Sequence, residues 1–268
     1  MSNLTLTDED IARYGRQIIV PGVGGAGQER LKNGSVLVVG AGGLGSPSLL
    51  YLASAGIGRI GIVDADVVDV TNLQRQIAHA TLDVGRNKAE SAAETIRAIN
   101  PLIDVVTYPV RLDPDNALEI FSDYDIILDG TDNFPTRYLI NDACVMLGKP
   151  LVTAAILRYS GQITVVRPGE TACYRCLFPV SPAAGAVPSC SQAGILGPVA
   201  GVMGSLQALE AIKLLLGSAD SIAGKFIAVD FLTLETQVME LHRNPSCASC
   251  GDEPTITKLE QAEESCSL

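Results

Sequence analysis

Residues 36–45 read VLVVGAGGLG, in which four apolar residues precede closely spaced glycines. The apolar run is short and rich in valine, which predicts a buried β-strand, and the glycines predict a tight turn into a helix. Gly40, Gly42 and Gly45 have the G-x-G-x-x-G spacing of a nucleotide-binding turn. Small residues there let the backbone approach phosphates, and the N-terminus of the next helix attracts the anion. The stretch predicts an α/β fold with a nucleotide at the carboxyl end of a strand.

Outward from this stretch, the chain alternates strand-like and helix-like runs joined by short loops. Expected strands cover 36–39, 60–63, 104–108, 125–128 and 150–153, and expected helices cover 8–19, 45–55, 88–99 and 137–147. The first helix is expected to end at Val20-Pro21-Gly22, and a glycine-rich connection leads from there to residues 28–32. Repeated βα units predict a largely parallel sheet covered by helices on both faces. The predicted fold class is α/β, with a Rossmann-like mixed sheet.

We expect one domain over residues 1–250, whose two halves differ in style. Residues 1–155 form the nucleotide-binding half. The half 156–250 has runs typical of antiparallel strands at 162–166, 225–230 and 235–241. It also contains one apolar helix at 199–216. Residues 251–268 are polar and acidic, which predicts a flexible C-terminal tail.

The composition argues against several classes of protein. A net charge of −11 over 268 residues disfavours nucleic-acid binding, because phosphate backbones need a basic surface. The first thirty residues lack the positive start and apolar stretch of a secretory signal. The longest apolar region, 195–216, is interrupted by Gln207, Glu210 and Lys213, so we expect a buried helix and no membrane span. We therefore expect a cytoplasmic protein.

The residues after the second strand bear on which nucleotide binds. Asp64 lies nineteen residues after Gly45, where an acidic side chain binds ribose hydroxyls, and this spacing alone favours NAD or FAD. The loop TNLQRQ at 71–76 adds amide and cationic side chains, and Lys88 opens the next helix. Two cations just past this strand suit a polyphosphate better than a nicotinamide. Each is equally consistent with an ordinary solvated charge.

A later acidic residue, Asp132 in LDGTDN, follows another expected strand. Open α/β sheets place ligand groups at the carboxyl ends of their strands. Asp132 is therefore a candidate magnesium ligand, with a helix N-cap as the alternative.

Seven cysteines need an account, since paired cysteines in a reducing compartment indicate metal or catalysis more than disulfides. Four of them form two C-x₂-C pairs separated by seventy residues: Cys173, Cys176, Cys247 and Cys250. Two such pairs can present four thiolates to one structural, tetrahedral zinc. A redox C-x₂-C is the alternative. Cys144 lies in an apolar helix and is expected in the core.

Six motifs together resemble the ThiF/MoeB/HesA family of adenylyltransferases, relatives of the ubiquitin-activating enzymes. The motifs are RYGRQI (13–18), GAGGLG (40–45), TNLQRQ (71–76), GTDN (130–133), CYRC (173–176) and GVMGSLQALEAIK (201–213). They occur in order from about residue 8 to residue 250. The resemblance implies that the nucleotide is ATP and that the substrate is a ubiquitin-like sulfur carrier protein.

The implied reaction is attack by the carrier's C-terminal glycine carboxylate on the α-phosphate of ATP, which gives an acyl adenylate and releases pyrophosphate. By resemblance, Gly43 and its neighbours line the nucleotide and Asp64 holds the ribose. The resemblance also assigns polyphosphate contacts to the 71–76 loop and the next helix, at Asn72, Arg75, Gln76 and Lys88. Asp132 would hold Mg²⁺, and the four paired cysteines would hold Zn²⁺.

Two further residues gain roles only through the resemblance. Arg16 would reach the triphosphate of a neighbouring subunit, so the active enzyme would be a homodimer. Without the family, Arg16 reads as a surface residue of the first helix. Cys190 lies in a loop rich in proline, glycine and alanine. In some family members a cysteine there joins the carrier through a sulfur or acyl linkage, and in others it is dispensable.

The resemblance leaves the pathway open between molybdopterin and thiamin biosynthesis. Residues 251–258, GDEPTITK, resemble the linker that leads into a rhodanese sulfurtransferase domain in longer relatives, whereas this sequence stops at Leu268. We therefore expect sulfur to come from a separate donor. Two other functions compete with this hypothesis. One is an NAD(P)-dependent oxidoreductase on the same sheet, and the other is a non-catalytic scaffold that only binds a ubiquitin-like partner.

Overall fold

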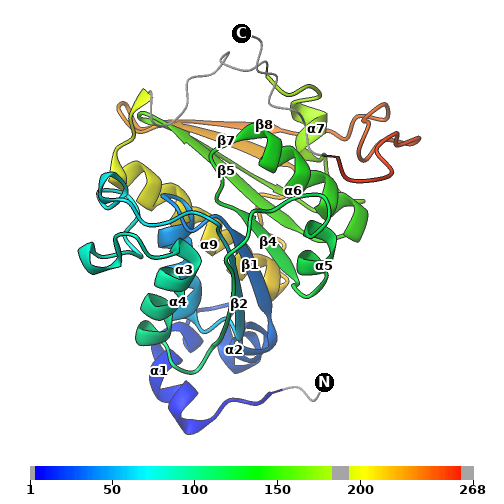
Figure 1. The fold of residues 1–268 in the computed structure, drawn as a ribbon. Helices are drawn as coiled ribbons and strands as arrows, with labels where there is room; N and C mark the ends of the chain where they lie inside the picture. Colours follow the sequence, from blue (N-terminus) through cyan, green and yellow to red (C-terminus); the bar gives the residue numbers. More distant parts are fainter. Residues whose placement is uncertain (1–3, 183–192, 261–268) are drawn as a thin grey trace.

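The computed structural model describes residues 4–182 and 193–260, and Figure 1 shows the arrangement of their helices and strands. One mixed sheet runs through them in the order β3-β2-β1-β4-β5-β6-β7-β8. Its strands are β1 (Ser35–Val39), β2 (Arg59–Val63), β3 (Asp104–Tyr108), β4 (Ile126–Asp129), β5 (Leu151–Leu157), β6 (Ser160–Val166), β7 (Lys225–Asp230) and β8 (Glu235–Glu240). The pairs from β3 to β5 are parallel. The pairs from β5 to β8 are antiparallel, which confirms the predicted mixed sheet.

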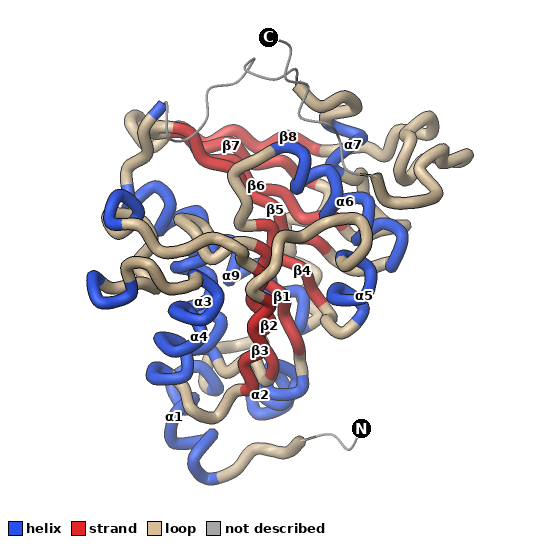
Figure 2. Tube along the Cα trace, in the orientation of Figure 1, coloured by secondary structure: helices blue, strands red, loops and turns tan. Residues whose placement is uncertain are grey.

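Helices cover both faces of the parallel half, as Figure 2 shows. The helices are α1 (Asp8–Ile18), α2 (Gly24–Asn33), α3 (Gly45–Ala55), α4 (Lys88–Ile99), α5 (Ala117–Ser122), α6 (Phe134–Leu147), α7 (Tyr174–Leu177) and α9 (Gly197–Leu216). Helices α3, α4 and α9 share one hydrophobic core, and α5 and α6 share the other. Strand β1 supplies both cores, because Val36 and Val38 point to the first and Leu37 and Val39 to the second. This alternation explains why the strand reads as an unbroken apolar run.

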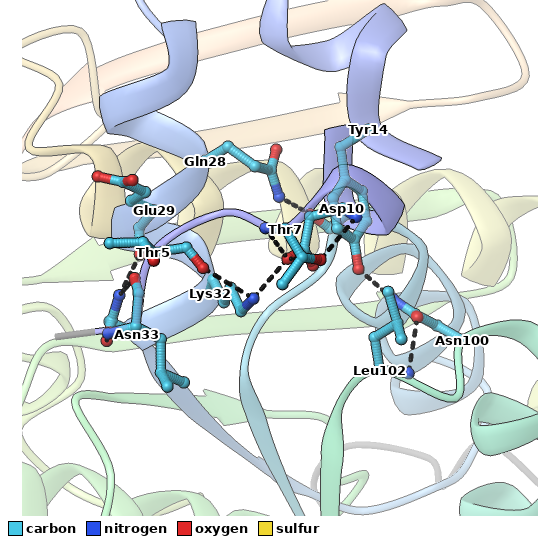
Figure 3. Close-up of polar contacts among 12 residues, drawn as sticks. Thr5, Thr7, Asp10, Tyr14, Gln28, Glu29, Lys32, Asn33, Asn100 and Leu102 are labelled. Carbon is cyan, nitrogen blue, oxygen red and sulfur yellow. Dashed lines mark hydrogen bonds and ion pairs between the residues drawn. The ribbon is translucent and has the colours of Figure 1, made fainter. Parts of the chain in front are cut away.

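Helix α1 is attached to its own subunit by the polar network in Figure 3. Thr7 caps the helix, since its hydroxyl accepts from the Asp10 backbone N–H at 3.2 Å. Asp10 is buried and forms an ion pair with Lys32 of α2. Burial alone would raise the pKa of Asp10, but the bonds from Lys32 and Thr7 outweigh it and lower that pKa. Tyr14 accepts from Asn100 Nδ2 at 2.7 Å, which joins α1 to the end of α4.

Several elements differ from the sequence expectation. The glycine-rich connection after residue 22 is helix α2, although glycine lowers helix propensity. Tertiary packing explains it, because a Cβ on Gly27 would lie 3.0 Å from Leu216 of α9, so the small residue lets the two helices approach closely. Helix α5 was not expected, and β5 continues four residues beyond Thr153.

Two regions of the second half bear on the sequence expectations. Helix α9 is long and apolar enough to cross a membrane, with a mean hydropathy of 1.5, but it packs on α3 and β5 as a core helix. The start of the expected tail makes backbone hydrogen bonds to the second cysteine pair's loop, from Thr255 and Ile256 to Ala248 O. Cys190 lies outside the described residues.

Candidate active site

The glycine turn lies at the carboxyl ends of β1 and β4. Gly40 has a φ of +93°, which favours glycine, and a Cβ on it would lie 2.9 Å from Gly130 O after β4. A Cβ on Gly45 would lie 1.8 Å from Gly40 O, so no side chain fits at the start of α3. At Gly42 and Gly43 an added Cβ meets nothing closer than 3.4 Å. The fold therefore requires the outer glycines for packing, whereas at the middle two a Cβ would make only ordinary van der Waals contacts.

Asp64 holds the glycine turn from the end of β2. Its Oδ2 accepts from the Ala41 backbone N–H at 2.8 Å, and its Oδ1 accepts from the Asp66 N–H at 2.9 Å. Burial raises the pKa of Asp64, although these two bonds and the charge of Lys88 oppose the rise. The carboxylate is thus fixed beside the glycine turn, where a ribose ligand is expected from the sequence.

The 71–76 loop lies against the same turn. The Arg75 side chain lies 3.7 Å from the Cβ position of Gly43, and its Nη1 donates to Thr71 O at 3.0 Å. Gln76 is buried, and its Nε2 lies 3.7 Å from the Cβ position of Gly42. Its Oε1 is buried without a hydrogen-bond partner among the described residues. A water molecule or a donor group of a ligand would satisfy this acceptor. Asn72 is half-buried in the short 3₁₀ turn Val70–Asn72.

Lys88 begins α4 and lies on the same side of the sheet as Asp64. Only 7 % of it is exposed, and its Nζ donates to Asp66 Oδ2 at 2.9 Å. Its charge opposes the rise that burial causes in the pKa of Asp64, so the two side chains are electrostatic neighbours. A buried ammonium can stabilise an anion more strongly than an exposed one. The structure therefore brings Gly42, Gly43, Asp64, Arg75 and Lys88 together at one edge of the sheet.

The segment after β4 contains two aspartates with different environments. Asp129 is fully buried and accepts from Arg137 Nε at 3.0 Å, Thr153 Oγ1 at 2.7 Å and Thr131 Oγ1 at 2.6 Å. Asp132 is exposed and lies three residues beyond the end of β4. It is the metal ligand expected from the sequence. The structure thus leaves Asp132 accessible to a ligand, whereas protein donors surround Asp129.

Arg137 was not anticipated as part of this region. Its guanidinium is buried against Asp129, donates to Thr131 O and Ala154 O at 2.9 and 3.0 Å, and lies over the Tyr174 ring. Burial by itself would lower the pKa of Arg137, but the charge of Asp129 outweighs it and raises that pKa. A basic residue eight positions after an aspartate that ends an apolar strand was the only sequence signal for this pair.

Arg16 lies far from the glycine turn of its own subunit. It is exposed on α1, next to Gln17, whose Nε2 donates to Ala55 O at 3.0 Å at the carboxyl end of α3. The glycine turn is at the other end of that 11-residue helix, about 16 Å away at a rise of about 1.5 Å per residue. An arginine side chain spans less than half of that length, so Arg16 does not reach the site of its own subunit.

The four paired cysteines meet at one point, although seventy residues separate the pairs. Their Sγ atoms all lie within 4.8 Å of one another. Three of the separations are 3.9 Å (Cys173–Cys176), 3.6 Å (Cys173–Cys247) and 3.3 Å (Cys176–Cys250). Tetrahedral zinc with Zn–S bonds of about 2.3 Å requires sulfur atoms about 3.8 Å apart. The four thiols therefore fit a closed, structural zinc site.

Comparison with known proteins agrees with this geometry. Residues 14–249 match the model of the ThiF family. The chain is 52% identical over 267 residues to a sulfur carrier protein adenylyltransferase of Thermus thermophilus, covering 98% of each chain. It is 48% identical to the probable adenylyltransferase/sulfurtransferase MoeZ of Mycobacterium tuberculosis, covering 98% of this chain and 67% of that protein. Among solved structures, E. coli MccB with ATP superposes with a TM-score of 0.71 at 27% identity, over 84% of this chain and 69% of that one. The chain belongs to the ThiF family.

Proposed function

We propose that this protein adenylylates the C-terminal glycine of a ubiquitin-like sulfur carrier protein, using ATP. The observation that carries the proposal is that the glycine turn, Arg75 and Lys88 lie close together, next to Gln76, whose Oε1 is buried with no hydrogen-bond partner among the described residues. Two cations just past the second strand suit a polyphosphate better than a nicotinamide. The named activities of the relatives reported above support the same reaction.

In this reaction a carboxylate oxygen of the carrier attacks the α-phosphorus of ATP, and the bond between that phosphorus and the bridging oxygen of pyrophosphate breaks. No covalent bond to the protein is needed, so catalysis rests on positioning and charge stabilisation. Asp64 would bind the ribose and Gly42 and Gly43 would admit the phosphates. Asn72, Arg75 and Lys88 would stabilise the charge that develops on the leaving pyrophosphate. Asp132, which is exposed at the same edge, would hold the Mg²⁺ that accompanies the nucleotide.

We further propose that the active enzyme is a homodimer in which Arg16 completes the partner's site. The seam between α3 and α9 exposes Tyr51, Val202 and Leu209, which are 58 %, 46 % and 49 % accessible. A cavity of 280 Å³ beside them is bordered by Gln17 of α1. Both helices begin at the glycine turn, and α3 ends beside Gln17 of α1, whereas α9 ends against α2. A two-fold axis across the middle of this seam would therefore bring α1 of one subunit to the glycine turn of the other.

Mixing two inactive variants tests this arrangement. An Arg16→Ala subunit paired with an Asp132→Ala subunit has one site with both residues intact. Random mixing of equal amounts should then restore about a quarter of the wild-type activity. Activity that stays at the level of either variant alone, in demonstrably mixed dimers, would exclude a role for Arg16 across the interface.

The carrier-dependent exchange of pyrophosphate into ATP tests the function itself. We expect exchange that requires the carrier's terminal glycine and falls about 10²–10³-fold in Arg75→Ala, because a preorganised charge at the reacting phosphates is lost. Asp132→Ala should abolish exchange without unfolding the protein. Nicotinamide binding with no exchange would instead establish the oxidoreductase alternative. Carrier binding with neither exchange nor ATP binding would establish the scaffold alternative.

Three finer assignments belong to the same proposal. The carrier would serve molybdopterin or thiamin biosynthesis in the cytoplasm, and the carrier captured from the native host would identify the pathway. Sulfur would come from a separate donor protein, which is tested by adding a candidate sulfurtransferase to the adenylylated carrier. For Cys190, Cys190→Ser decides between a covalent linkage to the carrier and a dispensable residue.

A further inference from the structure

His79 is a buried side chain that the proposed mechanism does not use. It follows the 71–76 loop and is 7 % exposed. Its Nε2 lies 2.9 Å from Ala41 O, in the middle of the glycine turn, and its Nδ1 lies 2.8 Å from Ser91 Oγ on α4. A carbonyl oxygen only accepts hydrogen bonds, so Nε2 carries the hydrogen. Burial lowers the pKa of His79, which favours the neutral ring. In that ring Nδ1 can accept from the Ser91 hydroxyl, for which Asp83 is a second acceptor.

These two bonds connect the three segments that hold the proposed phosphate ligands. Ala41 is between Gly40 and Gly42 of the turn, and its own N–H donates to Asp64, so His79 and Asp64 hold opposite sides of one residue. Ser91 is three residues after Lys88, on the same helix. The His79 backbone N–H donates to Gln76 O at 3.1 Å, which ties the imidazole to the end of the 71–76 loop.

We propose that His79 is a positioning residue for ATP, whose neutral imidazole fixes the glycine turn, the 71–76 loop and the start of α4 relative to one another. This inference rests on the proposed function, because it assumes that these three segments bind one polyphosphate. His79 itself does not contact the nucleotide. It acts by holding the Ala41 peptide, and therefore Gly42 and Gly43, at a fixed distance from Lys88.

A matched pair of amide variants separates the two bonds. In His79→Gln the longer side chain can place its Nε2 near the position of the imidazole Nε2 and donate to Ala41 O. In His79→Asn the shorter side chain can accept from Ser91 but does not reach Ala41. We expect His79→Asn to raise the KM for ATP about tenfold, as the loss of one buried hydrogen bond predicts, with the KM for the carrier unchanged. His79→Gln should restore most of the affinity for ATP.

A stability control distinguishes positioning from folding. Glu210 is similarly buried, at 5 % exposure, and accepts from Ser221 Oγ and the Ile222 N–H near the far end of α9. Glu210→Ala should lower the melting temperature but leave the KM for ATP unchanged. Ser91→Ala removes the hydroxyl beside Nδ1 without changing the imidazole, and it should also raise the KM for ATP. This variant provides the test if His79→Asn does not fold.

Titration calorimetry with ATP alone separates this inference from the proposed function. If the wild-type protein binds no ATP, the proposed function fails and this inference fails with it. If the wild type binds ATP and the His79→Asn and Ser91→Ala variants bind it with unchanged affinity, only the role of His79 is refuted. A weaker affinity in His79→Asn that is recovered in His79→Gln would support it.

Discussion

The buried pair of Asp129 and Arg137 provides the most direct test of how the site is held in place. Arg137→Met keeps most of the aliphatic volume but removes the guanidinium that pairs with Asp129 and donates to Thr131 O and Ala154 O. Asp129 would then be a buried carboxylate without its cation. Removing one partner of a buried ion pair typically costs about 3–5 kcal/mol, because the remaining charge is uncompensated.

The melting temperature converts this free energy into a measured shift. With 268 residues and about 2.1 cal/mol/K per residue, the unfolding entropy is about 0.56 kcal/mol/K. The expected destabilisation therefore lowers the melting temperature by about 5–9 K. Arg167→Met is the matched control, because its ion pair with Glu170 is exposed and such pairs contribute about 1 kcal/mol or less. That control should shift the melting temperature by less than about 2 K.

The double variant Asp129→Asn with Arg137→Met completes the cycle. Because both charges are gone, it should be less destabilised than the sum of the two single variants. Calorimetry measures stability, and pyrophosphate exchange reports the segment that carries Asp132. If Arg137→Met melts within about 2 K of the wild type, like the exposed control, the reasoning about this pair is wrong.

Three other perturbations give distinct readouts. Gly43→Ala should keep the melting temperature but weaken ATP binding at least about tenfold, because a methyl group fits the protein but occupies space for the phosphates. Gly45→Ala should instead destabilise the fold itself. Equal ATP binding in Gly43→Ala and the wild type would exclude close contact between the phosphates and Gly43. Metal analysis should find about one zinc per chain. Cys250→Ser should lose the metal and several kcal/mol of stability, whereas Cys144→Ala should keep the metal. Normal stability of the metal-free protein would refute the structural role of the zinc. Burial lowers the pKa of His79 below its ordinary 6.5, so the unfolded chain binds a proton that the native chain does not. The free energy of unfolding should therefore fall as pH falls below about 6.5, and urea titrations should show a smaller fall in His79→Gln; identical slopes would contradict it.

The fold class was predictable because it depends on local patterns that the sequence displays directly. The valine-rich run at 36–39 had to be buried on both sides, and the glycines after it had to allow a backbone with positive φ and a close approach to Gly130. The same patterns failed at α2, where glycines suggested a loop and packing against Leu216 made a helix. Local propensity is a weak determinant when a neighbouring element supplies the packing.

For the candidate site too, some features could be predicted from the sequence and others depended on the folded structure. The sequence by itself determined which residues carry charge or thiols and in what spacing, and this was enough to make Asp64, Arg75, Lys88 and the cysteine pairs candidates. Only the tertiary structure decided which of them meet, that Arg16 is a helix length away from its own glycine turn, and that His79 and Arg137 join segments distant in the chain. The physical reason is that a hydrogen bond or an ion pair depends on a distance of about 3 Å, and the chain sets such distances only after it folds.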